Sequence, residues 1–293
     1  MALVEHVTVV GTGLIGTSIA LALVKCGVVV RLTDRAPAAL EHAVRLGAGY
    51  PLAGQDRPAD LVVLAVSPAA VAPVLRQAQQ ARMGSHYTDV AGVKAPIVEA
   101  ARSQGCDLST FVPGHPMAGG EQPGPGAARA DLFVGRPWAL CPARVVSARS
   151  VDVVRAVIEM VGAVPCDLTA EAHDEAAALI SHLPHVVSSA LAARLSDADP
   201  IALRLAGNGV RDVTRVAAGD VALWLDVLGH NAGPVAAALE DLIEELRGAV
   251  RDLRAGGSGG SEALASVLRR GNDGRHRLLS GSARPGEHDR PPQ

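Results

Sequence analysis

One histidine in this sequence is placed where it could do acid–base chemistry. His115 lies between a glycine and a proline in PGHPMAGGEQPGPG (113–126), directly after an apolar run that predicts a strand. A histidine restrained in this way could accept a proton from an alcohol while hydride leaves the same carbon. A loop histidine with a purely structural hydrogen bond is the alternative, and the residue alone does not decide between them.

A glycine-rich turn near the N-terminus provides a candidate nucleotide site. Gly11, Gly13 and Gly16 in VTVVGTGLIGTS separate a predicted strand from a predicted helix. The first glycine permits a tight turn, the second lets the backbone approach a pyrophosphate, and the third lets helix and strand pack closely. The predicted cofactor-binding residues of this turn and of the end of strand 60–66 are Gly11, Thr12, Gly13, Leu14, Ile15, Gly16, Val66 and Ser67.

An acidic residue at the end of the second predicted strand indicates which dinucleotide binds. Asp34 follows Gly16 by 18 residues. A carboxylate at this point binds both ribose hydroxyls of NAD and repels the 2′-phosphate of NADP. Arg35 comes next and could accept that phosphate, so NAD is favoured and NADP stays open.

These candidate residues require a parallel sheet to position them. Short β-branched runs alternate with helical patterns through the first half of the chain, which predicts a Rossmann-type parallel sheet with helices on both faces. The predicted strands are 6–10, 28–33, 60–66, 86–90, 109–114, 137–142 and 163–168, and the predicted helices are 14–26, 36–47, 69–82, 94–104 and 147–161.

The pattern changes after residue 168. Apolar residues then recur at helical spacing, with a break or kink expected near Pro184. We therefore predict an α/β domain followed by an all-α domain: a dinucleotide-binding domain over 1–168, a helical substrate and dimerisation domain over 169–280, and a disordered tail over 281–293.

Composition narrows the class of protein. The net charge is −3 with a pI near 6.4, which gives no sign of a nucleic-acid partner. The four cysteines are far apart, which argues against a disulfide framework. We find no secretory signal and no long uncharged apolar run, so we expect a cytoplasmic protein without a membrane partner.

Six motifs follow one another in the order found in the prephenate dehydrogenase family, and the chain resembles this family over residues 5 to 280. They are GTGLIG, TDVAGVK, GHPMAGGEQPG, DLFVGRPWALCP, SHLPH and RDVTRVAAGDVALWLDVLGHN. The likeness is strongest to actinobacterial members. Many relatives carry a regulatory ACT domain after these motifs, and we expect none here.

The resemblance implies an oxidoreductase that acts with decarboxylation. Hydride leaves C4 of prephenate for the nicotinamide of NAD, and the C4 hydroxyl proton goes to a base. The forming carbonyl draws electrons from the C1 carboxylate, which leaves as CO2, and the product is 4-hydroxyphenylpyruvate. The resemblance also implies a homodimer, a small-molecule substrate and a place in tyrosine biosynthesis.

The resemblance assigns roles to individual residues. His115 is the acceptor at C4, and Arg215 is the planar cation that binds a substrate carboxylate. The other substrate-binding residues that it implies are Glu121 near the mouth of the site, Ser181, His182 and His185 at the domain junction, and Trp224, which closes the pocket.

Other interpretations of these residues stay open. His182 and His185 have the spacing of metal ligands on a helix, and only Asp174 or Glu175 could complete the set. The family uses no metal, so we expect none. Trp224 could be helix-packing core. Arg211 could form a surface or dimer salt bridge, and Lys94 could face solvent or touch the cofactor.

The chain departs from the family beside the predicted base. Gly92 stands in TDVAGVK where the family usually has serine, and Gln122 and Pro123 replace the more usual lysine and serine. Prephenate with a water in the serine gap is one expectation. Three alternatives are 4-amino-4-deoxyprephenate in secondary metabolism, arogenate, and a catalytically silent NAD-binding regulator.

Overall fold

The computed structural model describes residues 3–54, 56–120, 122–255 and 262–281. It divides into two compact units, Met1–Val235 and Ala236–Gln293, and each is described here by itself. The first unit holds the sheet and most of the helices that follow it. The predicted division into domains at 168 falls inside this unit, where the last strand gives way to helices, and it stays a prediction.

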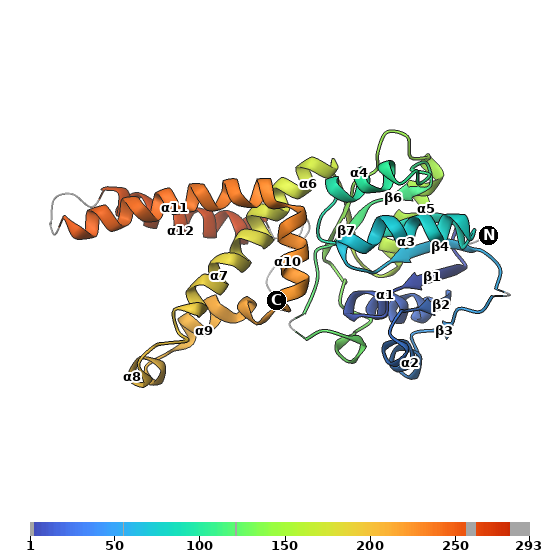
Figure 1. The fold of residues 1–293 in the computed structure, drawn as a ribbon, viewed down its shortest axis with the longest axis horizontal. Helices are drawn as coiled ribbons and strands as arrows, with labels where there is room; N and C mark the ends of the chain where they lie inside the picture. The colour runs from blue at the N-terminus through green and yellow to red at the C-terminus, as the bar shows by residue number, and fades with distance from the viewer. Residues whose placement is uncertain (1–2, 55, 121, 256–261, 282–293) are drawn as a thin grey trace, which may run out of the picture. The chain divides into compact units, whose positions relative to one another are not determined.

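The main sheet has the strand order of a dinucleotide-binding fold. Six strands lie in the order β3-β2-β1-β4-β5-β6, and every pairing is parallel (Figure 1). Their bounds are β1 His6–Val10, β2 Val29–Thr33, β3 Tyr50–Pro51, β4 Ala59–Leu64, β5 Gly84–Asp89 and β6 Phe111–Val112. Ligands of such sheets bind at the carboxyl ends of the strands where the order reverses, here β1 and β4.

Helices cover both faces of this sheet. The pleat of β4 shows why, because Leu61 and Val63 belong to one hydrophobic core and Val62 and Leu64 to the other. The first core includes residues of α1 (Leu14–Lys25), α2 (Pro37–Arg45) and α5 (Ala148–Met160), and the second includes residues of α3 (Pro68–Gln80) and α4 (Ala95–Ser103). The predicted α/β architecture is confirmed.

The predicted strand 109–114 is wrong in its extent. It divides at Pro113 into β6 and a separate strand, β7 (Gly114–Pro116), because proline has no N–H to continue a ladder. β7 pairs antiparallel with β8 (Pro137–Leu140), which pairs parallel with β9 (Val164–Asp167). His115 is therefore the middle residue of a strand paired with Ala139, and not a loop residue.

Helices complete the first unit. They are η1 (Pro125–Ala127), α6 (Ala170–Ala177), the π-turn η2 (Ala178–His182), α7 (Leu183–Ala193), α8 (Pro200–Arg204), α9 (Asn208–Thr214), η3 (Arg215–Ala218) and α10 (Val221–His230). The irregularity predicted near Pro184 is confirmed as the π-turn before it, since proline has no N–H for the regular helical bond.

The stretch Ala170–Ala193 is the one described helix long and apolar enough, by length and composition alone, to cross a membrane. His173, Asp174, His182 and His185 within it are buried. Asp174 accepts hydrogen bonds from the backbone at the start of α4. These two hydrogen bonds hold the stretch against the start of α4.

The second unit is helical. The long helix α11 (Ala232–Arg254) begins in the first unit and continues into the second, where α12 (Glu262–Gly281) lies. Arg270 of α12 donates to Glu245 of α11 at 2.9 Å. Ile243, Leu246 and Val250 of α11 remain exposed. The predicted tail spans 281–293; its first residue, Gly281, is the last of α12, and 282–293 lie outside the described residues.

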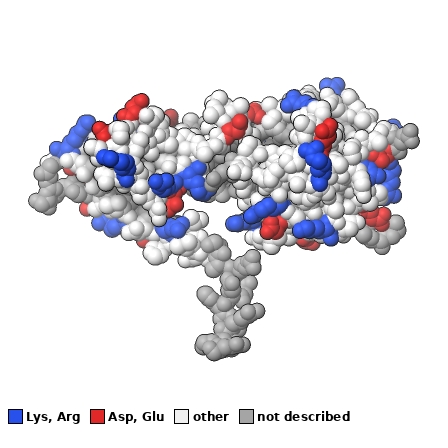
Figure 2. All heavy atoms as spheres, turned by 90° about the horizontal axis from the view of Figure 1, so that it is seen from below, with Lys and Arg blue, Asp and Glu red and all other residues white. Residues whose placement is uncertain are grey.

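Charged side chains of both signs are interspersed over the face drawn in Figure 2, separated by wide neutral areas. Among the described residues on that face, neither the positive nor the negative side chains form a broad patch. This distribution agrees with the small net charge of −3.

Candidate active site

The three glycines of the turn after β1 have three different surroundings. Gly11 has a φ of +99°, and a Cβ there would lie 2.2 Å from the carbonyl oxygen of Ala65. A Cβ on Gly16 would lie 2.0 Å from the carbonyl oxygen of Gly11, while a Cβ on Gly13 would meet nothing within 4 Å. Two glycines are thus needed for close packing, and the third leaves open space at the N-terminus of α1, where a pyrophosphate fits.

Asp34 at the end of β2 is held as a carboxylate. It accepts the amide and the hydroxyl of Thr12 at 2.6 and 2.9 Å and the amide of Ala36 at 2.8 Å. Burial raises the pKa of Asp34, but the hydrogen bonds from Ala36 and Thr12 outweigh it and leave the pKa below its ordinary value. The turn and this carboxylate together fit an NAD-type cofactor.

One cavity of about 700 Å³ brings the predicted nucleotide and substrate residues together. Of the predicted residues it is lined by Gly13, Leu14, Ile15, Gly16, Val66, Ser67, His115, Ser181, His182 and Trp224. The predicted residues that do not line it, among those the structure describes, are Gly11, Thr12, Asp34, Arg35, His185 and Arg215. Glu121 lies outside the described residues.

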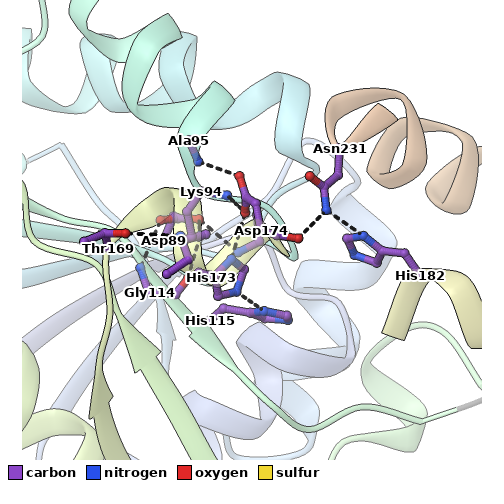
Figure 3. Close-up of polar contacts among 12 residues, drawn as sticks. Asp89, Lys94, Ala95, Gly114, His115, Thr169, His173, Asp174, His182 and Asn231 are labelled. Atoms are coloured by element: carbon purple, nitrogen blue, oxygen red, sulfur yellow. Dashed lines mark hydrogen bonds and ion pairs between the residues drawn. The ribbon is translucent and has the colours of Figure 1, made fainter. Parts of the chain in front are cut away.

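His115 is the end of a buried chain of hydrogen bonds (Figure 3). Its Nδ1 lies 2.9 Å from Nε2 of His173, and Nδ1 of His173 lies 2.8 Å from Oδ1 of Asp174. Asp174 also accepts the backbone amides of Lys94 at 2.7 Å and of Ala95 at 2.8 Å. His115 lines the cavity, and its other ring nitrogen, Nε2, lies 3.9 Å from the position of a Cβ on Gly92, which also lines it.

The surroundings of His115 favour its neutral form. Burial lowers the pKa of His115 well below its usual range, and the charge of Lys94 and the neighbouring histidines lower it further. A neutral imidazole whose Nε2 lies in the cavity can accept a proton at neutral pH.

Lys94 faces neither solvent nor the cavity. Its side chain is completely buried and forms an ion pair with Asp89, also completely buried, at the end of β5. Lys94 Nζ also donates to the carbonyl oxygen of Gly114 at 2.6 Å, and the Gly114 amide donates to Asp89 Oδ1 at 3.2 Å. Both sequence interpretations of Lys94 were therefore wrong: it fixes the strand that carries His115.

Trp224 closes one side of the cavity. Its ring stacks on that of His185, with 3.6 Å between centroids and 12° between planes. His185 lies outside the lining with its Nδ1 buried and unpartnered among the described residues. A Cβ on Gly219 would lie 2.4 Å from Trp224 Nε1, so glycine is required beside this stack.

Asn231, just after α10, connects the second cavity histidine to the first. Its amide nitrogen donates to the backbone carbonyl of Asp174 at 2.8 Å and lies 3.0 Å from Nδ1 of His182 (Figure 3). Burial lowers the pKa of His182, against a raising effect of Asp174. His182 thus lines the cavity as a neutral ring.

The glycine that replaces the family serine lies directly beside the predicted base. Gly92 lines the cavity, and a Cβ there would lie 3.9 Å from His115 Nε2 and 3.7 Å from Val227 Cγ1. These are ordinary contact distances, so a side chain would fit. The cavity beside Nε2 of His115 therefore lacks the serine hydroxyl that the family usually has at this position.

The sequence-based prediction did not place His173 and Asn231 in this site, and it considered Asp174 only as a possible metal ligand. His173 and Asp174 stand next to each other in TAEAHDEAA, and a buried His-Asp pair opening a helix was the signal that could have found them. Asn231 carried no local signal. Arg215, which was predicted, begins η3 with an exposed side chain.

Two family models match consecutive parts of the chain. Residues 19–166 match the prephenate dehydrogenase nucleotide-binding domain, and residues 169–270 match the prephenate dehydrogenase dimerization domain. The chain belongs to the prephenate dehydrogenase family. The resemblance drawn from the six motifs is confirmed.

Individual relatives agree with this assignment. The chain is 42% identical over 279 residues to the probable prephenate dehydrogenase NovF of Streptomyces niveus, covering 92% of this chain and 76% of NovF. It is 32% identical to the cyclohexadienyl dehydrogenase of Zymomonas mobilis, covering 84% and 88%. The prephenate dehydrogenase of A. aeolicus, crystallised with hydroxyphenyl propionate and NAD+, has a TM-score of 0.82 at 26% identity and covers 94% and 98%.

The chain is therefore an oxidoreductase of the prephenate dehydrogenase type with a Rossmann domain for an NAD-type cofactor. The relatives that it matches are named prephenate dehydrogenases and a cyclohexadienyl dehydrogenase.

Proposed function

We propose that the chain catalyses the NAD-dependent oxidative decarboxylation of prephenate to 4-hydroxyphenylpyruvate. One observation carries the proposal: Nε2 of His115 lies in the same cavity as the open glycine of the nucleotide turn. The turn at Gly13 and the N-terminus of α1 would hold the pyrophosphate, and Asp34 the adenosine ribose. NAD, when bound, supplies the hydride acceptor.

The residues of the chain would divide the remaining work. Neutral His115 accepts the proton of the C4 hydroxyl through Nε2, and its partner His173 holds the ring in place. His182 and Ser181 offer polar groups to the substrate, and Trp224 shields the cavity from water. Arg215 would bind a substrate carboxylate, as the family resemblance implies.

The choice of NAD over NADP rests on Asp34. Its carboxylate is held ionised by the hydrogen bonds of Thr12 and Ala36. A fixed negative charge at this point repels the 2′-phosphate of NADP. Arg35 beside it could offset part of that repulsion, so we expect a preference for NAD and not an absolute one.

A second substrate, 4-amino-4-deoxyprephenate, is favoured by Gly92. The family hydroxyl is missing beside Nε2 of His115. An amine at C4 carries more donors than a hydroxyl and has less need of a hydroxyl partner. Arogenate differs from prephenate in the side chain, and Gly92 does not bear on that difference.

We further propose that the protein is a cytoplasmic homodimer. The matching C-terminal model is described as a dimerization domain. The exposed apolar face of α11, with Ile243, Leu246 and Val250, suits packing against a second copy. Sedimentation equilibrium that returns the monomer mass at micromolar concentration would contradict this.

The test is NADH formation with prephenate, arogenate and 4-amino-4-deoxyprephenate in parallel, each with NAD and NADP. We expect turnover of prephenate with NAD as the preferred cofactor. A preference of tenfold or more for the amino analogue would replace prephenate by the second candidate. No turnover of any of the three would overturn the enzymatic proposal in favour of a silent regulator.

A further inference from the structure

The two histidines that line the cavity, His115 and His182, each have one ring nitrogen held by the protein. Nδ1 is the held atom in both rings, by His173 in the first and by Asn231 in the second. Their Nε2 atoms have no partner among the described residues and remain for the substrate. Because a neutral imidazole has one donor and one acceptor nitrogen, the partner of Nδ1 decides what Nε2 can do.

The partner of His115 makes its Nε2 an acceptor. Asp174 receives backbone N–H groups on both carboxylate oxygens, from Lys94 on Oδ1 and Ala95 on Oδ2, so it acts as an acceptor. His173 must then donate from Nδ1 to Asp174, and in the neutral form of His173 this leaves the lone pair of its Nε2 to accept from Nδ1–H of His115. Nε2 of His115 is left with its own lone pair.

The partner of His182 makes its Nε2 a donor. The amide nitrogen of Asn231 donates to the backbone carbonyl of Asp174, and the same nitrogen faces Nδ1 of His182. The reversed amide would place two carbonyl oxygens against each other, so this orientation is fixed by the network. Nδ1 of His182 therefore accepts, and Nε2 carries the hydrogen.

We propose that His173 and Asn231 are positioning residues that hold the two cavity histidines in opposite neutral tautomers, with an acceptor at Nε2 of His115 and a donor at Nε2 of His182. Both depend on Asp174, through its side chain in the first case and its backbone carbonyl in the second. Burial keeps the pKa of each ring below its usual value, so both are neutral at pH 7.

The arrangement matches an oxidation that needs one group to accept a proton and one hydrogen-bond donor to bind an anionic group of the substrate. The acceptor takes the proton at C4, and the donor binds a substrate carboxylate. This assignment of the two groups rests on the proposed function. The tautomers themselves follow from the hydrogen bonds and can be tested without a substrate.

The first test is a nitrogen-15 NMR spectrum of histidine-labelled protein, in which protonated and unprotonated ring nitrogens have distinct shifts. Signals are assigned by their loss in His115→Gln and His182→Gln. We expect an unprotonated Nε2 in His115 and an unprotonated Nδ1 in His182. An unprotonated Nδ1 in His115, or two protonated nitrogens in either ring at pH 7.5, would overturn the proposal.

The matched variant Asn231→Asp has the same shape but can only accept. It should force His182 to protonate Nδ1, so that the two His182 signals exchange while those of His115 stay unchanged. An unchanged His182 spectrum in the folded variant would contradict the role of Asn231. If this variant does not fold, the wild-type spectrum still decides the tautomers.

Kinetics provide the second test. His173→Leu removes the acceptor for Nδ1 of His115 and should lower kcat by about tenfold or more with little change in KM. His173→Gln offers a carbonyl acceptor instead and should restore most of the loss. Asn231→Asp should raise KM for the substrate more than it lowers kcat. Equal activity of the His173→Leu and His173→Gln variants would overturn the positioning role.

The control is His86→Gln, which changes a partly buried histidine bonded to Ser150 outside the cavity. Its kcat and KM should equal those of the wild type. A wild-type protein that turns over none of the three substrates would refute the proposed function. The NMR spectrum would still test the two tautomers, because it needs no substrate.

Discussion

Restoring the missing hydroxyl at position 92 tests the geometry around the predicted base. The substitution Gly92→Ser places a Cβ 3.9 Å from His115 Nε2 and 3.7 Å from Val227 Cγ1, which are ordinary contacts. The backbone of Gly92 is outside the left-handed region, so serine adds no backbone strain. We therefore expect the free energy of unfolding to stay within about 0.5 kcal/mol of the wild type.

The hydroxyl should change catalysis and not folding. A C–O bond of about 1.4 Å brings Oγ within hydrogen-bond distance of Nε2 or of the C4 hydroxyl that Nε2 contacts. One such bond made in the transition state contributes about 1–2 kcal/mol, so kcat/KM for prephenate should rise about 5- to 30-fold. The amino analogue, which does not need a hydroxyl partner, should gain less.

The assay is initial-rate NADH formation by the wild type and the Gly92→Ser variant on both substrates, with thermal unfolding as the control for structure. An unchanged or lower kcat/KM for prephenate in a variant of normal stability would refute the reasoning. It would show that position 92 does not border C4.

Three further perturbations have defined outcomes. Because the pKa of His115 lies well below its usual value and the base must be neutral, kcat/KM should stay constant as pH falls to about 6.5 and decline only below that; a decline that begins above about 6.5 in the pH–rate profile would contradict this. Gly219→Ala would place a Cβ 2.4 Å from Trp224 Nε1, so we expect a loss of about 1–3 kcal/mol in thermal unfolding and a higher KM; an unchanged Tm would show that the stack yields freely. Lys94→Met leaves a buried carboxylate without its cation and should cost about 3–5 kcal/mol in urea unfolding. Arg102→Met, which removes an exposed ion pair, is its control and should cost under about 1 kcal/mol; similar losses in both variants would refute the buried-pair argument.

The local parts of this fold could be predicted from the sequence. Short β-branched runs predicted the bounds of the strands β1, β2, β4 and β5 to within two residues. Strands that are buried on both faces have such continuous apolar runs. The glycine turn and Asp34 could also be predicted from the sequence, since their spacing is fixed by one strand-turn-helix unit.

The hydrogen-bonded network around His115 could not be predicted in the same way. His115 and His173 are 58 residues apart, and Asn231 and His182 are 49 apart, so no local periodicity connects them. Lys94 was misjudged because a lysine at a helix start is usually solvated, and only the packed structure shows Asp89 buried opposite it. The division of the predicted strand 109–114 at Pro113 could not be predicted, because it depends on the pairing of β7 with β8 in a second sheet.

The most direct test of His115 as the catalytic base is the kcat of His115→Asn compared with the wild type on the preferred substrate, with the dissociation constant for NAD measured alongside. We expect kcat to fall by about 100-fold or more while NAD binding is unchanged, because the turn at Gly11–Gly16 is untouched. A variant that retains more than about a tenth of the wild-type kcat would contradict His115 as the base.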